Sequence, residues 1–369
     1  MIREATPEAK KKHGIKAGVY APTWEEVMEY SVTLQSFLQQ YPEVKARVEG
    51  LVGQVRSCSR HAGGVVIAED LDQSMPLINS GGVRQAPWAE GQNVRHLEPM
   101  GFIKFDLLGL STLKMMEGCI EHILRRHYGV EEPTFEDVLQ YYNENVHPDV
   151  IDFDDQSVYE NIFHQGKWAG VFQFTEQGAQ SFCTKAQPRN IIDISAVTSI
   201  FRPGPLSAGV DADYMEAKNH PQYVSYLSEE SQEITGETFG FLIFQEQIAL
   251  LAHRLGGLTL DEGNLLRKIL TKKGTGKGGI KTKLRVKFVT GCAAKGIDRD
   301  KAEALWDKLE YFSGYGFNKS HAVSYSIISY QCAWLWNYYP SEWMAAFLDK
   351  EPETRKEKAI NIAKKYGFK

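Results

Sequence analysis

Cysteine is scarce in this sequence, and long apolar runs are missing from it. Five cysteines occur among 369 residues, each alone and with no Cys-x-x-Cys pair. An odd, scattered set argues against a disulfide framework or a zinc site and fits a reducing cytoplasm. No run of 18 apolar residues occurs, and no apolar stretch follows the charged N-terminus. We therefore expect neither a membrane span nor a secretory signal.

Two common nucleotide-binding signatures are missing as well. The sequence has no Gly-x-x-x-x-Gly-Lys-Ser/Thr segment, which excludes a P-loop ATPase. Residues 274–279 match Gly-x-Gly-x-x-Gly, but no predicted strand precedes them, so we reject a dinucleotide fingerprint. With 43% hydrophobic and 24% charged residues the chain can bury a sizeable core. At roughly 150 residues per domain, its length predicts two or three domains.

The predicted elements are typical of an α+β protein. Residues 1–57 have mainly helical spacing, with a new helix expected at Pro42. Short strands are predicted at Val65–Ile67, where we expect burial, and at residues 102–106, with a brief extended piece at 171–174. Further helices are expected from residue 111 or 112, and over 247–255, 259–270 and 321–338, and an apolar run at 191–201 ends at a rigid Arg-Pro-Gly-Pro segment. A small α/β part up to about residue 110 should therefore precede a larger helical part.

The clearest charge feature is a basic segment in a chain whose formal net charge is −5. Between Arg267 and Lys287 it holds nine basic residues and no acidic one. They are Arg267, Lys268, Lys272, Lys273, Lys277, Lys281, Lys283, Arg285 and Lys287. Such a segment is an electrostatic footprint for phosphates. The alternative is a solvated helix with a glycine-rich loop.

A carboxylate and an ammonium are predicted to share one strand face. Lys104 and Asp106 stand two residues apart in the second predicted strand, and side chains at that spacing point the same way. A carboxylate at the end of an apolar strand needs a cation or several donors. The pair would suit a metal–phosphate site, and the alternative is that Asp106 caps the following turn.

A second acidic group invites a metal interpretation. Asp149, Asp152, Asp154 and Asp155 lie close together, and the alternation of Asp152 and Asp154 could place both on one face. The segment is polar and leads into a helix, however, so N-capping by Asp is the simpler interpretation.

Two further segments could hold an anion. Asn318, Lys319, Ser320 and His321 open a predicted helix, whose N-terminal amides favour negative charge. The alternative there is a Ser-capped helix with a solvated lysine. Arg202 stands in Phe-Arg-Pro-Gly-Pro, either as a rigid phosphate clamp or as a turn residue stacked on Phe201.

Taken in chain order, the segments resemble one family. They are HAGGVVIA at 61–68, KFDLLGL at 104–110, VFQ at 171–173, FRPGPL at 201–206, QEQ at 245–247, LRK at 266–268 with Lys272 and Lys273, and YGFNKSH at 315–321. This series, within roughly residues 38–350, is similar to the C family of bacterial replicative DNA polymerases, the DNA polymerase III alpha subunits.

The resemblance implies a division into polymerase subdomains. Residues 1–57 would end the thumb, 58–110 would form the second half of a palm with the polymerase-beta-like nucleotidyltransferase fold, and 111–369 would be a C-terminally incomplete fingers domain. Asp106 matches the third catalytic carboxylate, which would help to hold two Mg²⁺ ions. Lys104 matches the lysine of the same motif, near the nucleotide phosphates.

The resemblance also implies contacts to dNTP and to primer–template DNA. The nucleotide-binding residues would be Arg202, Gln245, Gln247, Arg267, Lys268, Lys272, Lys273, Asn318, Lys319, Ser320 and His321. The DNA-binding residues would be Arg60, His61, Lys277, Lys281, Lys283, Arg285 and Lys287.

The departures from the family bear on activity. The first two catalytic aspartates belong to a PDxDxDF motif that this sequence lacks before Asp106, and PDVIDFDD at 148–155 comes after it. Also missing are the PHP domain, the first palm half and the segments beyond the fingers. Smaller departures are Phe244 where the family usually has Tyr, and Thr271 where it usually has Gly.

We therefore expect a split or fragmentary polymerase that is active only with a second polypeptide carrying the PHP domain and the first palm half. A split gene would produce it, in the cytoplasm of a bacterium or of a phage host. A sliding clamp would bind through other segments. The alternative is a non-catalytic fingers module or relic that binds DNA or nucleotide. A truncated piece of a longer polymerase would have the same residue assignments.

Overall fold

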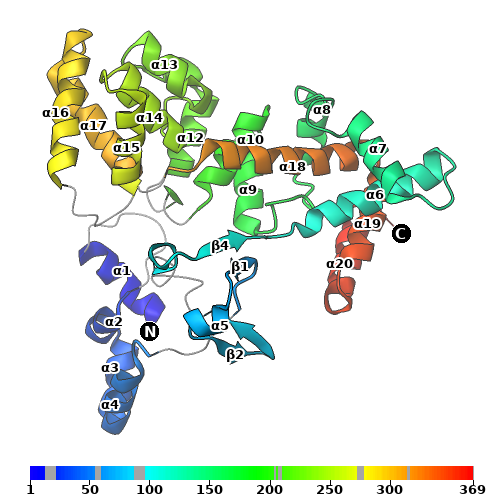
Figure 1. Ribbon diagram of the computed structural model, residues 1–369, viewed down its shortest axis with the longest axis horizontal. Helices are drawn as coiled ribbons and strands as arrows, with labels where there is room; N and C mark the ends of the chain where they lie inside the picture. Colours follow the sequence, from blue (N-terminus) through cyan, green and yellow to red (C-terminus); the bar gives the residue numbers. More distant parts are fainter. Residues whose placement is uncertain are drawn as a thin grey trace. The chain divides into compact units, whose positions relative to one another are not determined.

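The computed structural model describes residues 1–12, 22–54, 60–86, 96–202, 205–206, 210–271, 278–313 and 316–368. The chain divides into two compact units, Met1–Ala9 with Ala21–Ser111, and Lys10–Tyr20 with Thr112–Lys369. In the described residues, the first unit combines short helices with short strands, whereas the second is almost entirely helical (Figure 1). The α+β class expected from the sequence is confirmed.

Four helices open the first unit. They are α1 (Ile2–Lys12), α2 (Trp24–Tyr30), α3 (Val32–Gln40) and α4 (Pro42–Leu51). Pro42 begins α4 as predicted. Proline is tolerated there because an N–H in the first helical turn has no intrahelical acceptor, so the N–H that proline lacks is not missed. The chain breaks again at Ser31, whose hydroxyl accepts the Leu34 N–H at 3.2 Å and caps α3. Sequence spacing alone did not show this second break.

The strands of the first unit form two antiparallel pairs in the described residues. Strand β1 (Gly64–Ile67) pairs with β4 (Ile103–Asp106), and β2 (Ile78–Ser80) pairs with β3 (Val83–Gln85). The short helices α5 (Leu71–Ser74) and η2 (Glu98–Met100) lie between them in the sequence. The register places Val66 opposite Lys104 and Gly64 opposite Asp106, so Lys104 and Asp106 share a face with Val66.

The expected burial of the first strand is wrong. Val65 is 44% exposed and Ile67 is 63% exposed, and their partners across β4, Phe105 and Ile103, are 46% and 62% exposed. Val66 on the opposite face packs against a small cluster of Met75, Leu97 and Phe102. A pair of strands has two faces, and the described part of this unit covers only one of them.

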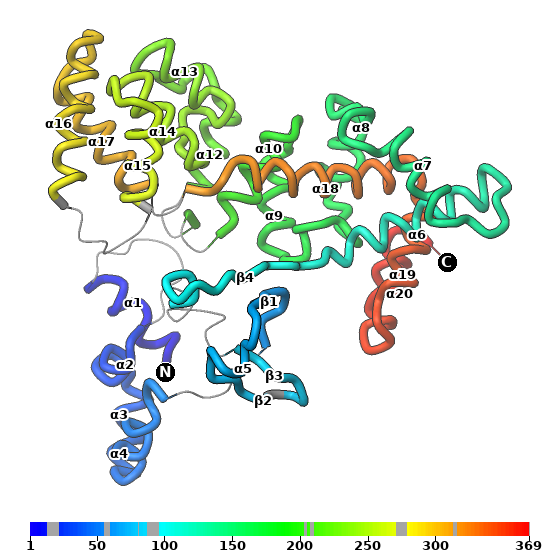
Figure 2. Tube along the Cα trace, in the orientation of Figure 1, coloured from blue at the N-terminus to red at the C-terminus, as the bar shows by residue number. Residues whose placement is uncertain are grey.

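The second unit has a large hydrophobic core around one long helix. Its elements are α6 (Ser111–His127), α7 (Phe135–Asn145), α8 (Gln156–Val158), the π-helical turn η3 (Tyr159–Phe163), α9 (Gln177–Ala186), α10 (Ile191–Ile200), α12 (Val210–Asn219), α18 (Lys319–Tyr338), α19 (Pro340–Lys350) and α20 (Glu353–Lys365). Helix α18 lies beside α10, as the Cα trace also shows (Figure 2). The hydroxyls of Ser195 and Ser326 lie 3.0 Å apart between these helices, and such small side chains allow a close approach.

A separate core holds the following helices together. They are α13 (Glu229–Thr235), α14 (Gln245–Arg254), α15 (Leu260–Thr271), α16 (Gly278–Ala294) and α17 (Arg299–Ser313). The short helices η4 (Pro221–Tyr223) and η5 (Gly236–Thr238) lie before and after α13 in the sequence. The predicted capping box of α15 is confirmed, with Thr259 N to Glu262 Oε2 at 2.7 Å. The backbones after α14 and within α16 meet at Gly256 and Gly291. A Cβ on Gly291 would lie 1.9 Å from the Gly256 carbonyl oxygen, so only glycine fits there.

The predicted extended piece at 171–174 is wrong. The backbone turns here, with Val171 N donating to Trp168 O at 3.1 Å and Phe174 N donating to Val171 O at 3.3 Å. Gln173 adopts a φ of 66°, in the left-handed region that non-glycine residues rarely occupy. Apolar residues in such a short run do not distinguish a strand from a buried turn.

Within the described ranges, no helix combines the length and the apolar character that a membrane span needs.

Candidate functional sites in the two units

The predicted pair on strand β4 forms in the first unit. Lys104 Nζ lies 3.1 Å from Asp106 Oδ1, and the Lys104 side chain is 15% exposed whereas that of Asp106 is 65% exposed. Alternation along the strand places both on one face, as predicted. Asp106 therefore meets a cation at the end of its strand and still presents most of its carboxylate to solvent.

His61 joins this pair from the segment before β1. Its Nδ1 accepts the backbone N–H groups of Gly63 at 3.1 Å and Gly64 at 2.5 Å, and its Nε2 lies 3.3 Å from Lys104 Nζ. A Cβ on Gly64 would lie 2.5 Å from Lys104 Cε, so glycine permits this close approach. Arg60, the neighbouring residue, is exposed. Because Nδ1 accepts, a ring proton belongs on Nε2, and a donor then faces the Lys104 ammonium.

A complete metal site is not present in the part of the chain that the structure describes. No three His, Cys, Asp or Glu side chains lie close enough together there to hold an ion. Asp106 can supply one carboxylate ligand, and divalent metals in phosphoryl transfer need more than one. Among the described residues here, Asp106 therefore offers one carboxylate of the kind that a magnesium site would use.

The acidic group at 149–155 caps a helix. Asp155 Oδ1 accepts the Ser157 N–H at 3.0 Å at the start of α8, and Asp152 Oδ1 accepts the Asp154 N–H at 2.9 Å. The Tyr338 hydroxyl donates to Asp155 Oδ2 at 2.6 Å. The metal interpretation has no support, because these carboxylates accept hydrogen bonds from the surrounding chain.

In the second unit, segments far apart in the sequence meet around Gln245. Its backbone N–H donates to Phe317 O at 2.9 Å, and Phe317 N donates to Ile243 O at 2.9 Å, which closes a parallel bridge. The Gln245 side chain donates to Gly316 O at 2.8 Å and accepts from Arg267 Nη1 at 2.8 Å. Gln245 thus links the starts of α14 and α18 to α15, where Arg267 and the exposed Lys268 lie.

Arg202 belongs to the same cluster. Its guanidinium carbon lies 3.6 Å from the centre of the Phe317 ring, so the alternative of stacking on Phe201 is wrong. Desolvation lowers the pKa of Arg202 below its ordinary value. Beyond Phe317 follow the exposed His321, at 5.3 Å between ring centres, and Tyr325, stacked on His321 at 4.1 Å. Sequence reasoning missed Phe317 as a site residue, although it stands within the quoted YGFNKSH segment.

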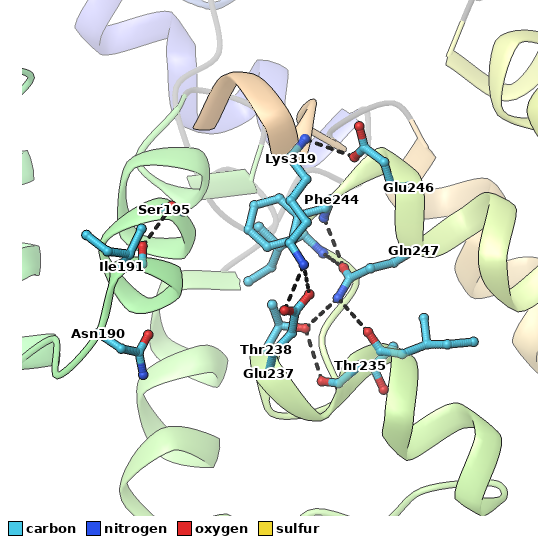
Figure 3. A network of polar contacts seen from close by, with 12 residues as sticks. Asn190, Ile191, Ser195, Thr235, Glu237, Thr238, Phe244, Glu246, Gln247 and Lys319 are labelled. Carbon is cyan, nitrogen blue, oxygen red and sulfur yellow. Dashed lines mark hydrogen bonds and ion pairs between the residues drawn. The ribbon is translucent and has the colours of Figure 1, made fainter. Parts of the chain in front are cut away.

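Two glutamates hold the N-terminus of α18. Glu246 accepts from Asn318 Nδ2 and from the Lys319 backbone N–H, both at 2.9 Å. Glu237 accepts from Lys319 Nζ at 2.7 and 2.8 Å (Figure 3). Asn318, not Ser320, caps the helix through the His321 N–H at 2.8 Å, and Ser320 is exposed. Sequence reasoning missed both glutamates, of which Glu246 stands inside the quoted QEQ motif.

Gln247 lies beneath this site and is 2% exposed. Its Oε1 accepts the N–H groups of Ile243 at 2.9 Å and Phe244 at 3.0 Å, and its Nε2 donates to Thr238 Oγ1 at 2.8 Å and to Ile234 O at 3.3 Å (Figure 3). The amide therefore has its hydrogen-bonding partners within the protein. Its geometry is that of a residue that positions the Phe244–Gln247 turn.

Several basic residues assigned to DNA binding form ion pairs within the unit. Arg285 Nη2 lies 2.6 Å from Glu303 and 3.2 Å from Asp307, Lys287 Nζ lies 2.7 Å from Glu262, and Lys281 contacts Glu310. Lys283 is exposed. Lys272, Lys273 and Lys277 lie outside the described residues. Carboxylates of α15 and α17 thus neutralise part of the charge of the basic segment. These ion pairs join residues far apart in the chain, so they could not be predicted from the sequence.

Comparisons with known proteins agree with the order of the family motifs along the chain. Residues 6–109 match the model of the bacterial DNA polymerase III alpha NTPase domain, and residues 118–296 match that of the bacterial DNA polymerase III alpha subunit finger domain. The chain is 33% identical over 344 residues to the DNA polymerase III subunit alpha of Campylobacter jejuni, covering 92% of this chain and 27% of that protein. It is 34% identical over 335 residues to the DNA polymerase III subunit alpha of Aquifex aeolicus, and this match covers 89% of this chain and 27% of that protein.

The subunit alpha of Vibrio cholerae is 31% identical over 348 residues, covering 92% of this chain and 29% of that protein. The chain thus spans little more than a quarter of the length of the curated relatives that it matches. Matches to two successive domain models, in the same order as the motifs, leave one assignment. The chain belongs to the family of bacterial DNA polymerase III alpha subunits.

Proposed function

We propose that this chain forms part of a DNA polymerase that adds nucleotides from dNTP to a primer 3′-hydroxyl on template DNA. One observation supports this most: Arg202, Gln245, Arg267 and Phe317, from four segments of the family pattern, meet in one cluster. Cations and amide groups on a helical frame suit the negative charge of a triphosphate. Residues 1–57, 58–110 and 111–369 would then be the thumb end, second palm half and fingers.

In this proposal, the fingers bind the triphosphate. Arg202 and Arg267 provide planar guanidinium groups, which can bind phosphate oxygens through two hydrogen bonds. Lys268, Lys319, Ser320 and His321 extend the donor surface, as would Lys272 and Lys273. Gln245 and Asn318 orient their neighbours. Gln247 holds the turn from below.

The palm strand contributes Asp106 and Lys104. Bound Mg²⁺ would lower the charge of the phosphates and activate the 3′-hydroxyl, and Asp106 would be one of its ligands. Lys104 and His61 present two nitrogen donors 3.3 Å apart, and a phosphate oxygen between them would accept from both. Arg60 and the exposed Lys283 would contact the DNA backbone, with Lys277, Lys281, Arg285 and Lys287 in support.

The missing carboxylates would come from a complementary polymerase fragment with the PHP domain and the first palm half. The exposed face of Val65, Ile67, Ile103 and Phe105 supports such a partner, because an apolar sheet face gains stability when another layer covers it. The rest of the replicase, including any sliding clamp, would bind through other segments, in the cytoplasm.

Mixing the two polypeptides tests the proposal. The chain is combined with a fragment that carries PDxDxDF, and extension of a labelled primer is followed with Mg²⁺ present. Extension by the mixture and by neither part alone is the expected result. A mixture that associates but does not extend the primer would favour the alternative, a non-catalytic module that binds DNA or nucleotide.

A further inference from the structure

We propose a second ligand site in the helical unit, one for a nucleoside phosphate. A cavity of about 450 Å³ lies between the turn at residues 166–175 and helix α20. Cavities that bind small molecules usually have volumes of about 300–1,000 Å³. None of the residues that we assign to the polymerase site lines this cavity.

One wall of the cavity is basic. Helix α20 directs Arg355, Lys358 and Lys365 toward it, at spacings of three and seven residues that place them along one side of the helix. Glu351 is the acidic residue of the lining, and its Oε2 lies 3.3 Å from Arg355 Nε. Neither Lys358 nor Lys365 forms an ion pair with a residue that the structure describes, and both are exposed. The wall therefore has an excess of positive charge.

The opposite wall is aromatic. The Trp168 ring stacks on Phe174 with 4.7 Å between ring centres and 27° between planes. A third ring, Tyr366, lies at the end of α20, on the basic side of the cavity. Trp168 is half-buried, so part of its surface faces the cavity. Indole and phenol rings offer flat apolar surfaces on which a nucleobase can stack. Thr175 and Gln180 add polar groups to the lining.

The wall around Trp168 is fixed in place before any ligand arrives. The Trp343 indole N–H donates to Ala169 O at 2.9 Å, and the Tyr366 hydroxyl donates to Gly166 O at 3.2 Å. Lys356 Nζ donates to Leu348 O at 2.7 Å at the start of α20. A site that is already ordered loses less entropy when it binds a ligand.

A phosphate group and a nucleobase match these two walls. The phosphate would bind the basic wall through charge-assisted hydrogen bonds, while the base would stack at Trp168. A free mononucleotide and the 5′-phosphorylated end of a nucleic acid strand share this chemistry. The cavity is too small for a duplex, whose diameter exceeds that of a single base and phosphate.

The test uses the whole chain and adenosine 5′-monophosphate with a fluorescent ribose label, titrated at low salt and followed by anisotropy. The double variant Lys358→Gln with Lys365→Gln should weaken binding by roughly tenfold or more, because two charge-assisted contacts are lost. Lys364→Gln, next in sequence but outside the lining, is the matched control and should bind as the parent does. Photo-cross-linking with the 8-azido nucleotide should label peptides within 166–175 or 353–366.

Equal affinity of the double variant and the parent would overturn the proposal, as would cross-links confined to the cluster around Gln245. Competition separates the two sources of the ligand. A 5′-phosphorylated tetrathymidylate that displaces the label better than adenosine 5′-monophosphate identifies a strand end, and the reverse identifies the free nucleotide. An unphosphorylated tetramer that competes equally well would contradict a phosphate site. Variants that lose primer extension but keep this binding separate the two sites.

Discussion

The guanidinium of Arg202 lies 3.6 Å above the ring of Phe317, although 114 positions separate the two residues in the chain. A cation over an aromatic face is held there by the charge distribution of the ring. Phe317 therefore fixes a side chain that would otherwise sample many rotamers. The same ring contacts His321, so one phenylalanine orders two of the proposed nucleotide-binding residues.

Replacing Phe317→Leu in the complemented polymerase should raise the KM for dNTP by roughly three- to tenfold, since the lost stacking disorders Arg202. The effect on kcat should be smaller. Steady-state primer extension at varied dNTP concentration measures both constants. Phe135→Leu, at an exposed position on α7, is the control. An unchanged KM would show that the stack does not serve nucleotide binding.

Asp106→Asn should reduce extension by the complemented polymerase by about 10³-fold or more, because an amide is a far weaker magnesium ligand than a carboxylate. Binding of primer–template should change little. Asp72→Asn, another exposed aspartate of the first unit, should retain activity. Rapid-quench measurement of a single addition gives the rate. A variant as fast as the parent would leave Asp106 without a catalytic role.

Glu237→Gln should lower the KM for dNTP by about two- to fivefold. The carboxylate now holds Lys319 Nζ at 2.7 Å and competes with a triphosphate for that ammonium. Glu233→Gln removes a comparable contact, to Arg254 at 2.9 Å, outside the cluster and should leave the KM unchanged. A raised KM for Glu237→Gln would mean that the glutamate positions Lys319 for the nucleotide instead.

Gln247→Leu should lower the free energy of unfolding by about 2–4 kcal/mol, because two buried backbone N–H groups lose their acceptor. Urea denaturation followed by circular dichroism measures the change. Gln140→Leu, on the exposed side of α7, should stay within about 0.5 kcal/mol of the parent. A small loss for Gln247→Leu would show that the turn before α14 can rearrange.

The stability contributed by Glu342 should depend on pH. Burial raises the pKa of this carboxyl, but hydrogen bonds from the backbone and His127 and the charge of Arg126 outweigh it and hold the pKa below its usual 4.5. A lowered carboxyl pKa stabilises the fold above pH 4.5 and does so less as the pH falls through the folded-state value. The stability difference between the parent and Glu342→Gln should therefore shrink below pH 4.5. For the control Glu353→Gln, at an exposed position, the stability difference from the parent should stay small over the whole pH range.

Local patterns in the sequence predicted much of the helical framework and one pair in the candidate site. The Thr259–Glu262 capping box, the proline start of α4 and the shared face of Lys104 and Asp106 depend only on residues a few positions apart. Propensity and periodicity act over such distances. The family pattern added which distant segments matter for function.

Contacts between distant segments could not be predicted in this way. The pairing of Arg202 with Phe317, of Lys319 with Glu237 and of Arg285 with Glu303 depends on how helices pack. The predicted burial of β1 is wrong for a related reason. Apolar residues in a strand show that a covering layer would stabilise it, but they do not show whether that layer is present. The family pattern implies that Gln247 binds nucleotide, but its motif does not show that the side chain is buried and bonded to Ile243, Phe244 and Thr238.

The uncovered face of β1 and β4 also bears on how this chain behaves when it is alone in solution. Four apolar side chains lie side by side there, and the two strands leave outer edges unpaired in the described residues. A second copy could add its strands to these edges, and the self-associated form would be favoured as concentration rises. Dilution, or co-expression with the fragment that covers this face, should keep the chain monodisperse in sedimentation experiments.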